Sequence, residues 1–368
     1  MGLAWLSRWG CSPLLGLLGR FGPEAVWEAT RTKLLRWGLS PAAVQRFEDR
    51  RRQFCPSVAE HQLEESRLSF LPYGSAFFST GLTHLSYPPA GLFVRGKLEL
   101  LESLSRRPCM AVVGTRKASA YGSRQAETFA CALARRGAVV VSGMAFGIDA
   151  VAHRAALDAG GVSVAVLGCG ADVVYPRRHA DLHRRLSHAG LVVSELPPGC
   201  PPARWTFPHR NRLLAALSGA VLVVEGSKTS GAMQTAGWSL ELGKPVFVVP
   251  GPVMVERHEG CNALIYDGAT PALCPEGLVE DFLAATGMET GEQASLALPD
   301  GAEVSNRDQS SMRPDESLLE LLAAGPHSVD ELARLTGWPV RLVVVHLAGL
   351  ELQGLVARGG PGLFIRAP

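Results

Sequence analysis

The sequence predicts an α/β protein built around a doubly wound parallel sheet, and three observations support this class. Six apolar runs have the length of strands: Met110–Val113, Ala138–Ser142, Ser163–Leu167, Leu191–Ser194, Ala220–Val224 and Pro245–Val249. Helical patterns, such as those over 122–136, 149–159 and 231–242, alternate with them. The strands are apolar along their whole length, which is typical of parallel sheets that helices cover on both faces. We therefore assign residues 68–290 to one sheet domain.

A small helical unit is expected before the sheet domain, over residues 1–60. Pro23 follows a glycine and opens one helix. Ser40 followed by Pro41 is a capping residue with proline in the first helical turn. The run Arg50–Arg52 lies near the end of the last helix, where cations complement the helix dipole. Contact with nucleic acid explains this run equally well.

A third unit is expected over residues 314–368, after a polar linker over 291–313. Glu316–Leu322 predicts a first helix, and Ser328 with Glu331 forms a capping box that opens a second. Val340–Gln353 predicts a third helix, and Gly359–Gly360 centres a hairpin after it. Three helices followed by a hairpin indicate the winged form of a helix-turn-helix.

The composition excludes several classes of protein. The 368 residues carry 36 Lys+Arg against 34 Asp+Glu, a net charge of +2, so nucleic-acid binding would depend on a local patch. The 8 cysteines are scattered without a C-x-x-C pair, which indicates reduced thiols, a cytoplasmic location and no metal site. The apolar run Leu14–Leu18 is too short for a signal peptide or a membrane span, so no membrane association is expected.

The segment Phe207–Arg212, with Arg204 just before it, brings together three arginines, an asparagine and a phenylalanine. Arginine forks match phosphate geometry and an aromatic face can stack a base, so single-stranded nucleic acid is the natural ligand. The alternative is a helix N-terminus together with a buried arginine–carboxylate pair.

Three loops of the sheet domain have the composition of an anion-binding track. Ligands of such sheets bind beyond the carboxyl ends of the strands, where loops lead into helices. Small residues, hydroxyls and cations in these loops suit phosphate, and a track rather than one deep pocket suits a polymer. The residues singled out are Gly114, Thr115, Arg116 and Lys117 in the first loop, Ser142 and Gly143 in the second, and Lys228, Ser230, Gly231 and Thr235 in the third.

Neither a catalytic set nor a cofactor motif is expected. The loops lack the G-x-x-x-x-G-K-[ST] pattern of a P-loop and the G-x-G-x-x-G of a dinucleotide site. His153 follows Asp149 by four residues, so the two share a helix face; a hydrogen bond between them, or a helix cap by Asp149, is expected rather than catalysis. Glu195 and Glu225 end strands, and pairing with neighbouring arginines is their expected role.

An ordered series of motifs resembles one protein family. The series comprises Gly114-Thr115-Arg116, Ser142-Gly143-x-Ala145-x-Gly147-Ile148-Asp149 with Ala152-His153, Leu167-Gly168-x-Gly170 with Tyr175-Pro176, Ser194-Glu195, Phe207-Pro208-x-Arg210-Asn211-Arg212, Ser230-Gly231 with Thr235-Ala236, and Val249-Pro250-Gly251. Over roughly residues 68–275 it closely resembles the DNA-processing protein A (DprA/Smf) family of bacterial natural transformation. The flanking units resemble the sterile-alpha-motif-like (SAM-like) and winged-helix domains of many members.

The resemblance implies an extended Rossmann-like domain that binds and protects incoming single-stranded DNA, forms a homodimer and has no catalytic activity. It further implies that the strand is handed to the RecA recombinase while single-strand-binding protein is displaced. In such proteins the segment matching 207–212 is a loop of the DNA groove. By matching position, the DNA-contacting residues are Arg116, Phe207, Arg210, Arg212, Lys228 and Ser230; Arg204 and Lys117 join them on charge alone.

Two other functions stay open. Nucleotide-processing phosphoribohydrolases that resemble the lysine-decarboxylase-like family share this broad fold. They carry a Pro-Gly-Gly-x-Gly-Thr loop followed by a catalytic Glu, whereas here Pro252 follows Pro250-Gly251, and Gln234 stands where an acid would be useful. The second alternative is a transcription regulator that acts through the winged helix. Its candidate recognition helix contains only two basic residues, Arg341 and His346, although a helix that reads DNA is usually more basic. A protein-contact role is therefore favoured at least as much as duplex binding.

Overall fold

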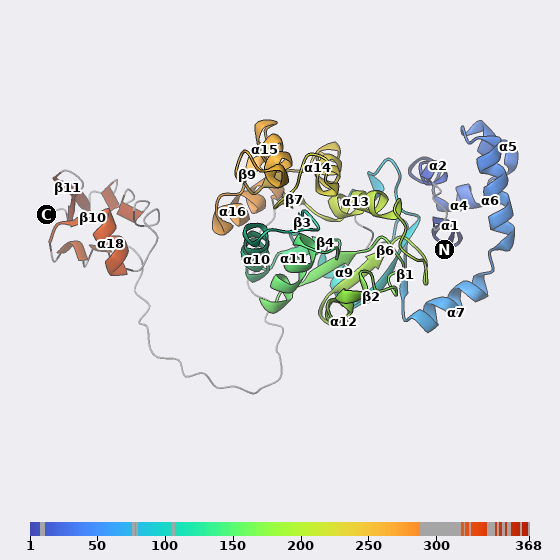
Figure 1. The fold of residues 1–368 in the computed structure, drawn as a ribbon, viewed down its shortest axis with the longest axis horizontal. Coiled ribbons are helices and arrows are strands. Elements are labelled where there is room, and N and C mark those ends of the chain that lie inside the picture. Colours follow the sequence, from blue (N-terminus) through green and yellow to red (C-terminus); the bar gives the residue numbers. More distant parts are fainter. Residues whose placement is uncertain are drawn as a thin grey trace. The chain divides into compact units, whose positions relative to one another are not determined.

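The computed structural model describes residues 1–7, 12–75, 78, 80–104, 107–287, 318–319, 321–323, 325–336, 343, 346–347, 350–351, 355–360 and 363–366. They belong to two compact units, Met1–Ser295 and Leu296–Pro368 (Figure 1). The expected linker over 291–313 lies outside the described residues, as does most of the expected helix over 340–353.

A mixed sheet forms the centre of the first unit. Its nine strands in the described part of the chain follow the order β1-β2-β6-β5-β4-β3-β7-β8-β9. From β6 to β9 all neighbours are parallel, whereas β2 runs antiparallel to both β1 and β6. The chain leaves β3 toward β4 on one side and returns to β7 on the other, so the strand order reverses there. The strands are β1 (Ser69–Pro72), β2 (Gly91–Gly96), β3 (Cys109–Val113), β4 (Val139–Ser142), β5 (Ser163–Val166), β6 (Leu191–Ser194), β7 (Ala220–Val223), β8 (Val246–Val248) and β9 (Thr270–Pro271).

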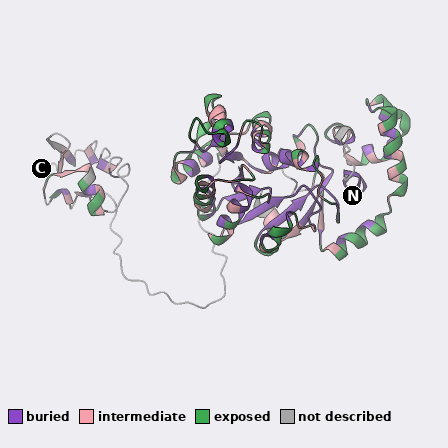
Figure 2. Cartoon of the chain, viewed as in Figure 1, coloured by how far each residue is buried: buried purple, intermediate pink, exposed green. Residues whose placement is uncertain are grey.

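Helices cover both faces of this sheet. One face packs against Met110 and Val112 of β3 through α10 (Ala120–Arg135), α11 (Ile148–Asp158) and α16 (Pro275–Thr286). The other packs against Ala111 and Val113 through α13 (Thr206–Leu217) and α14 (Gly231–Glu241). Successive side chains of β3 thus serve opposite cores, and Figure 2 shows the central strands buried. Further elements are α8 (Thr80–Thr83), α9 (Glu99–Leu104), η2 (Arg177–His179), α12 (Ala180–Ala189) and α15 (Glu256–Tyr266).

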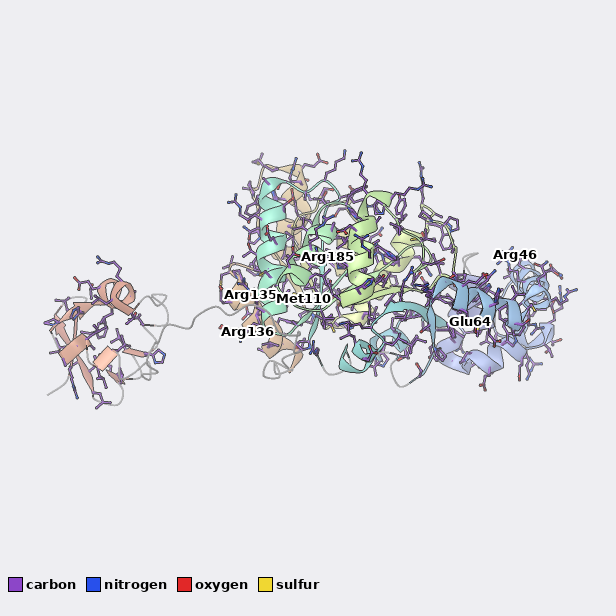
Figure 3. All side chains as sticks on the ribbon, turned by 90° about the horizontal axis from the view of Figure 1, so that it is seen from below. Arg46, Glu64, Met110, Arg135, Arg136 and Arg185 are labelled. Carbon is purple, nitrogen blue, oxygen red and sulfur yellow. The ribbon has the colours of Figure 1, made fainter. Side chains whose placement is uncertain are left out.

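The α/β doubly wound class is confirmed by this arrangement. The six predicted strands correspond to β3 through β8, each within one residue at either end. The helices predicted over 122–136, 149–159 and 231–242 correspond to α10, α11 and α14. Each of these helices follows a parallel strand, so its N-terminus lies at the carboxyl edge of the sheet and its C-terminus at the opposite edge. Arg135 and Arg136 accordingly lie at the far end of α10 (Figure 3).

Short helices precede the sheet. They are α1 (Gly2–Leu6), α2 (Ser12–Leu15), α3 (Leu18–Phe21), α4 (Pro23–Glu28), α5 (Arg31–Arg36), α6 (Pro41–Gln53) and α7 (Pro56–Ser66). The Ser40 hydroxyl accepts a hydrogen bond from the Ala43 amide at 3.3 Å, as the capping pattern predicted. Trp5 packs edge-on against Phe93 of β2, with 5.6 Å between ring centroids. The N-terminal helices therefore share a hydrophobic core with the sheet.

One residue of the basic run in α6 has a clear packing role. The Arg51 guanidinium donates to the carbonyls of Trp27 and Ala29 at 2.5 and 3.1 Å. It also lies over the Phe47 ring, 5.1 Å from its centroid. Arg51 thus joins α6 to the end of α4.

The second unit contains a small antiparallel sheet of order β10-β12-β11. Its described elements are β10 (His327–Ser328), α18 (Val329–Thr336), β11 (Val356–Gly360) and β12 (Leu363–Arg366). The predicted capping box is present: the Glu331 carboxylate accepts from the Ser328 amide at 2.9 Å, and the Glu331 amide donates to the Ser328 hydroxyl at 3.3 Å. β11 and β12 pair as the predicted hairpin.

Candidate functional site

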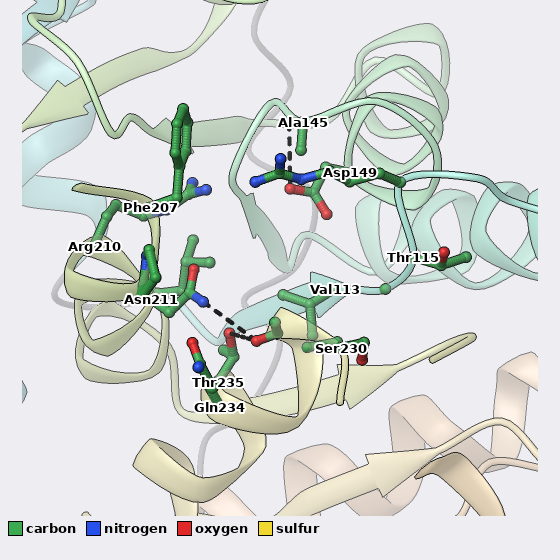
Figure 4. A pocket seen from close by; sticks show the side chains of 16 residues that line it. Val113, Thr115, Ala145, Asp149, Phe207, Arg210, Asn211, Ser230, Gln234 and Thr235 are labelled. Carbon is green, nitrogen blue, oxygen red and sulfur yellow. Dashed lines mark hydrogen bonds between the residues drawn. The ribbon is translucent and has the colours of Figure 1, made fainter. Parts of the chain in front are cut away.

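A pocket of about 280 Å³ opens where the strand order reverses, at the carboxyl ends of β3 and β7. This is the place where doubly wound sheets bind their ligands. Figure 4 shows Phe207 and Asn211 from α13 on one side, Asp149 and Val113 across from them, and Ser230 with Thr235 at the start of α14. The other residues that line the pocket are Gly114, Thr115, Arg116, Ala145, Pro208, Arg210, Leu214, Gly231, Ala232 and Gln234.

The loop after β3 is held in one conformation by its neighbours. A side chain on Gly114 would lie 2.5 Å from the Ile148 side chain and 2.9 Å from the Glu225 carbonyl, so only glycine fits. The Thr115 amide donates to the Glu225 carbonyl at 2.7 Å, and its hydroxyl accepts from the Lys117 amide at 3.2 Å. The backbone of this loop is therefore anchored, and the Arg116 and Lys117 side chains are exposed.

The segment implied to be a loop, 207–212, forms the first turns of α13 instead. Pro208 lies in the first turn, where its missing amide proton leaves no intrahelical bond unmade. The Thr206 hydroxyl bonds the Gly168 carbonyl at 2.5 Å and anchors this end of the helix. Because a helix repeats every 3.6 residues, Phe207, Arg210 and Asn211 share the face that lines the pocket, and Arg212 points elsewhere.

Arg212 has a structural role, which corrects its assignment as a DNA contact. Its guanidinium makes two bonds to the Glu195 carboxylate, at 2.8 and 2.6 Å, and donates from Nε to the Tyr87 carbonyl at 3.0 Å. Its side chain is 1% exposed. The alternative of a helix N-terminus with a buried arginine–carboxylate pair is therefore right for this residue.

Arg210 places a buried positive charge beneath the pocket. Its guanidinium donates to the Val166 carbonyl, and among the described residues its Nε has no hydrogen-bond partner. It packs against Gly143, where a side chain would lie 2.1 Å from Nη1. Burial lowers the pKa of Arg210, and the nearby Asp149 opposes that change. Gly143 thus makes room for this arginine and does not line the pocket.

Asp149 and His153 do not bond each other. The Asp149 carboxylate accepts from the Ala145 amide at 3.3 Å and so steadies the loop before α11, where Gly147 is the capping residue. Burial raises the pKa of Asp149, against the charge of Arg210. The His153 ring shares a hydrogen bond with the Ser163 hydroxyl at 2.7 Å, and burial lowers its pKa to about 3. His153 is therefore neutral at physiological pH.

The start of α14 forms the third wall of the pocket. The Asn211 amide donates to the Gly231 carbonyl at 3.2 Å and ties α13 to this wall. The Ser230 hydroxyl is buried and, within the described part of the chain, unpartnered. The first amides of a helix lack intrahelical partners and favour anions, so this end of α14 suits a phosphate.

The predicted site residues fall into three groups. The pocket brings together Gly114, Thr115, Arg116, Phe207, Arg210, Asn211, Ser230, Gly231 and Thr235. Lys117, Arg204 and Lys228 are exposed but do not line it. Ser142, Gly143 and Arg212 are buried structural residues; the Ser142 hydroxyl donates to the Val112 carbonyl at 2.6 Å and joins β4 to β3. Glu225, expected to pair with an arginine, lies 3.6 Å from Arg257.

Aromatic residues beside the pocket were not predicted as part of the site. The Tyr175 ring lies 5.5 Å from Phe207, and the Arg116 guanidinium lies over the Phe207 ring, 5.1 Å from its centroid. Phe146 and Trp205 are also exposed at this edge. A signal was present in the sequence, since Tyr175-Pro176 is followed by two arginines, but only the structure brings it beside residue 207.

Comparison with known families and structures gives consistent matches. The family model "DNA recombination-mediator protein A" matches residues 69–283, and that of the "DprA winged helix domain" matches residues 306–362. The chain belongs to the DprA family. Protein Smf of Escherichia coli is 39% identical over 83% of this chain and 79% of its own length. A DprA protein of Mycobacterium tuberculosis is 39% identical over 76% of this chain and 70% of its own length.

Solved structures of DprA proteins resemble this fold. DprA from Streptococcus pneumoniae superposes with a TM-score of 0.66 at 30% identity, over 76% of this chain and 96% of its own. A Helicobacter pylori DprA structure, described for its single-stranded DNA binding mode, gives a TM-score of 0.53 at 28% identity, over 60% of this chain and 98% of its own.

Two tests for other kinds of site give no candidate. No helix in the described ranges is both long and apolar enough to cross a membrane. Within the same ranges, no three His, Cys, Asp or Glu side chains are grouped so that they could hold a metal ion.

Proposed function

We propose that this DprA-family protein binds single-stranded DNA along the carboxyl edge of its sheet, with the pocket as the central contact. The observation that carries the proposal is the Arg116–Phe207 pair at the pocket, above the buried charge of Arg210. A cation next to an aromatic ring offers one contact to a phosphate and one to a base. The H. pylori relative, described as binding single-stranded DNA, supports the same ligand.

The distribution of charge favours a polyanion over a small neutral ligand. Arg116, Lys117, Arg204 and Lys228 are exposed around the pocket, and within the described residues no carboxylate forms an ion pair with any of them. Exposed cations without partners attract phosphates and release counterions when they bind them. Because the whole chain has a net charge of only +2, the attraction for a polyanion depends on local groups of cations such as this one.

The pocket also favours a single strand over a duplex. Its walls are helix ends and tight loops, and a base reaches Phe207 only when it is not paired within a double helix. A phosphoribohydrolase would need an acid on the α14 wall, where Gln234 stands. The strand-binding function therefore accounts for more of the lining residues.

Further parts of the proposal follow from the family resemblance. The bound strand is protected and passed to RecA, single-strand-binding protein is displaced, and a homodimer presents two grooves to one long strand, which raises avidity. These steps serve natural transformation and involve no catalysis. They are tested by adding the protein to DNA coated with single-strand-binding protein and timing RecA filament formation. A lag that does not shorten would contradict the loading step alone.

Fluorescence anisotropy with labelled oligo-dT and a matched duplex, over a salt series, tests the binding step. We expect preferential single-strand binding that weakens strongly in an Arg116→Ala/Arg204→Ala variant. The matched control is Arg135→Ala/Arg136→Ala, which removes two exposed arginines at the opposite edge of the sheet (Figure 3). Equal binding by both variants would contradict the site, and no binding to either DNA by the wild type would contradict the function.

A further inference from the structure

Phe207 offers a base less free surface than its place in the pocket suggests. Its ring packs on the backbone of Gly168, where a side chain would lie 2.9 Å from Cδ1. Arg116 lies over the ring and Tyr175 lies beside it at an interplanar angle of 38°. One aromatic residue in this setting holds at most one base, so a longer strand needs further contacts.

Two neighbouring rings are more accessible than Phe207. Tyr175 is 39% exposed and Phe146 is 42% exposed. Exposed rings forgo the gain from burial, about 25 cal/mol for each Å² of apolar surface, so rings exposed at a ligand-binding edge are available to a ligand. Tyr175 is in contact with Phe207 and therefore continues directly from the pocket.

The topology places these rings in a row with the pocket. Tyr175 follows β5, Phe146 follows β4 and Arg116 follows β3, and these three strands are adjacent and parallel. Their carboxyl ends lie at the same edge of the sheet. A strand that leaves the pocket at Arg116 thus meets the loops after β4 and β5 next.

Phe146 is backed by a rigid neighbour. The His179 ring packs edge-on against it with 4.8 Å between centroids, and its Nδ1 donates a hydrogen bond to the Met144 carbonyl at 3.1 Å. Burial lowers the pKa of His179, so the ring is neutral at physiological pH. The support under Phe146 is therefore a packed aromatic ring.

The charge at this end is positive. Arg177 and Arg178 are exposed in η2, and no described carboxylate forms an ion pair with either. Of the nearby acids, Asp172 accepts two bonds from the Gly199 amide and Asp181 pairs with Arg184. Two exposed guanidinium groups next to two exposed rings repeat the combination found at Arg116 and Phe207.

We propose that Tyr175 and Phe146 form a second base-stacking platform, with Arg177 and Arg178 as its phosphate contacts, so that the strand extends from the pocket across the loops after β4 and β5. This extension rests on the proposed single-strand binding. It assigns the direction in which the strand leaves the pocket: toward β5 rather than only toward β7 and Lys228.

The test compares a short oligo-dT of about four nucleotides with a long one of about sixteen, which are the limits of the site sizes of single OB-fold domains that bind single strands. We expect Tyr175→Ala to weaken binding of the long oligonucleotide about tenfold, as expected when one stacked base is no longer held, and to leave the short one unchanged. Tyr175→Phe keeps the ring and should bind like the wild type. Circular dichroism checks that each variant is folded.

A second variant tests the same platform without touching an aromatic residue. Arg177→Ala/Arg178→Ala should lower the magnitude of the log-affinity versus log-salt slope by about 1.4 for the long oligonucleotide only, which corresponds to about 0.7 for each phosphate contact. Arg135→Ala/Arg136→Ala is the matched control and should keep the wild-type slope.

The outcomes separate the platform from the function on which it rests. A wild type that binds neither oligonucleotide overturns the proposed function. If Arg116→Ala weakens binding but the arginine pair and Tyr175→Ala bind the long oligonucleotide normally, the function stands and the platform is wrong. Equal weakening of both oligonucleotides by Tyr175→Ala also overturns the platform, because Tyr175 would then act only by holding Phe207.

Discussion

Arg212 and Glu195 form a two-pronged ion pair that is closed to solvent, with side-chain exposures of 1% and 4%. Glu195 follows β6, and Arg212 lies in the second turn of α13, so the pair fixes this helix on the sheet. The Ser7 hydroxyl donates to the Glu195 backbone carbonyl at 2.7 Å, which brings the N-terminal helices to the same point. Arg212 thus sets the orientation of Phe207 and Arg210 without reaching the pocket itself.

Arg212→Met should destabilise the first unit by about 3–5 kcal/mol, because it leaves the Glu195 carboxylate buried without its partner. Urea denaturation followed by circular dichroism measures this change. The double variant Arg212→Met/Glu195→Leu should lie closer to the wild type, since no unpaired charge is buried. If the stability losses from the two single substitutions simply added up in the double variant, the pair would not act as a unit.

The same pair predicts how stability depends on pH. Burial raises the pKa of Glu195, but the charge and hydrogen bonds of Arg212, together with the charge of His209, lower it by a larger amount. The pKa of Glu195 therefore lies below its ordinary value of 4.5. A carboxyl with a lowered folded-state pKa stabilises the fold above its unfolded pKa, and this contribution is lost as the pH falls through the folded value. As the pH is lowered from 4.5, the urea midpoint should therefore fall more steeply for the wild type than for the double variant. Parallel curves would count against the pair as the cause.

Gly114→Ala should disturb the loop after β3, because the new methyl group would meet Ile148 and the Glu225 carbonyl. We expect a loss of about 1–3 kcal/mol in the free energy of unfolding and weaker DNA binding through a displaced Arg116. Gly237→Ala is the control: nothing lies within 4 Å of its added methyl group, and it should stabilise α14 by about 0.5–1 kcal/mol. Wild-type stability and affinity in Gly114→Ala would show that the loop tolerates a side chain.

Arg116→Ala should lower the magnitude of the log-affinity versus log-salt slope for oligo-dT by about 0.7, the value for one phosphate neutralised on a single strand. The Arg116 side chain is exposed, so its truncation should leave the fold intact and the urea midpoint unmoved. An unchanged slope with weaker binding would assign Arg116 to holding the Phe207 ring in place and not to a phosphate.

The sheet was predictable from the sequence because its strands are short apolar runs buried on both faces. The N-terminal strands β1 and β2 were missed, since they form an antiparallel pair that is not part of the alternating pattern. The start of helix α13 was predicted as a loop, because a proline and several cations in a short segment are typical of ligand-binding loops. Proline in a first turn is compatible with a helix, so the segment alone does not decide between the two.

The candidate site was predictable in outline, because loops after parallel strands meet at one edge. Which arginine faces the ligand was not predictable. Arg210 and Arg212 are two residues apart on a helix and point to different sides, and the partner of Arg212 lies 17 residues away in sequence. Ser142 lies in a segment with the composition of a ligand-binding loop, but its hydroxyl donates a hydrogen bond to the Val112 carbonyl of β3. Tyr175 follows a different strand, and only the structure shows that its ring lies beside Phe207.

The most direct test of the central claim is photo-crosslinking of the full chain to oligonucleotides that carry 5-iododeoxyuridine. The crosslinked residues are then identified by mass spectrometry of the peptides. Crosslinking at wavelengths this base absorbs favours aromatic side chains in contact with it, so it reports where bases lie. We predict crosslinks to Phe207 and to Tyr175, which Arg116→Ala reduces and Arg136→Ala leaves unchanged. Crosslinks confined to residues 296–368, with none at the carboxyl edge of the sheet, would contradict the account.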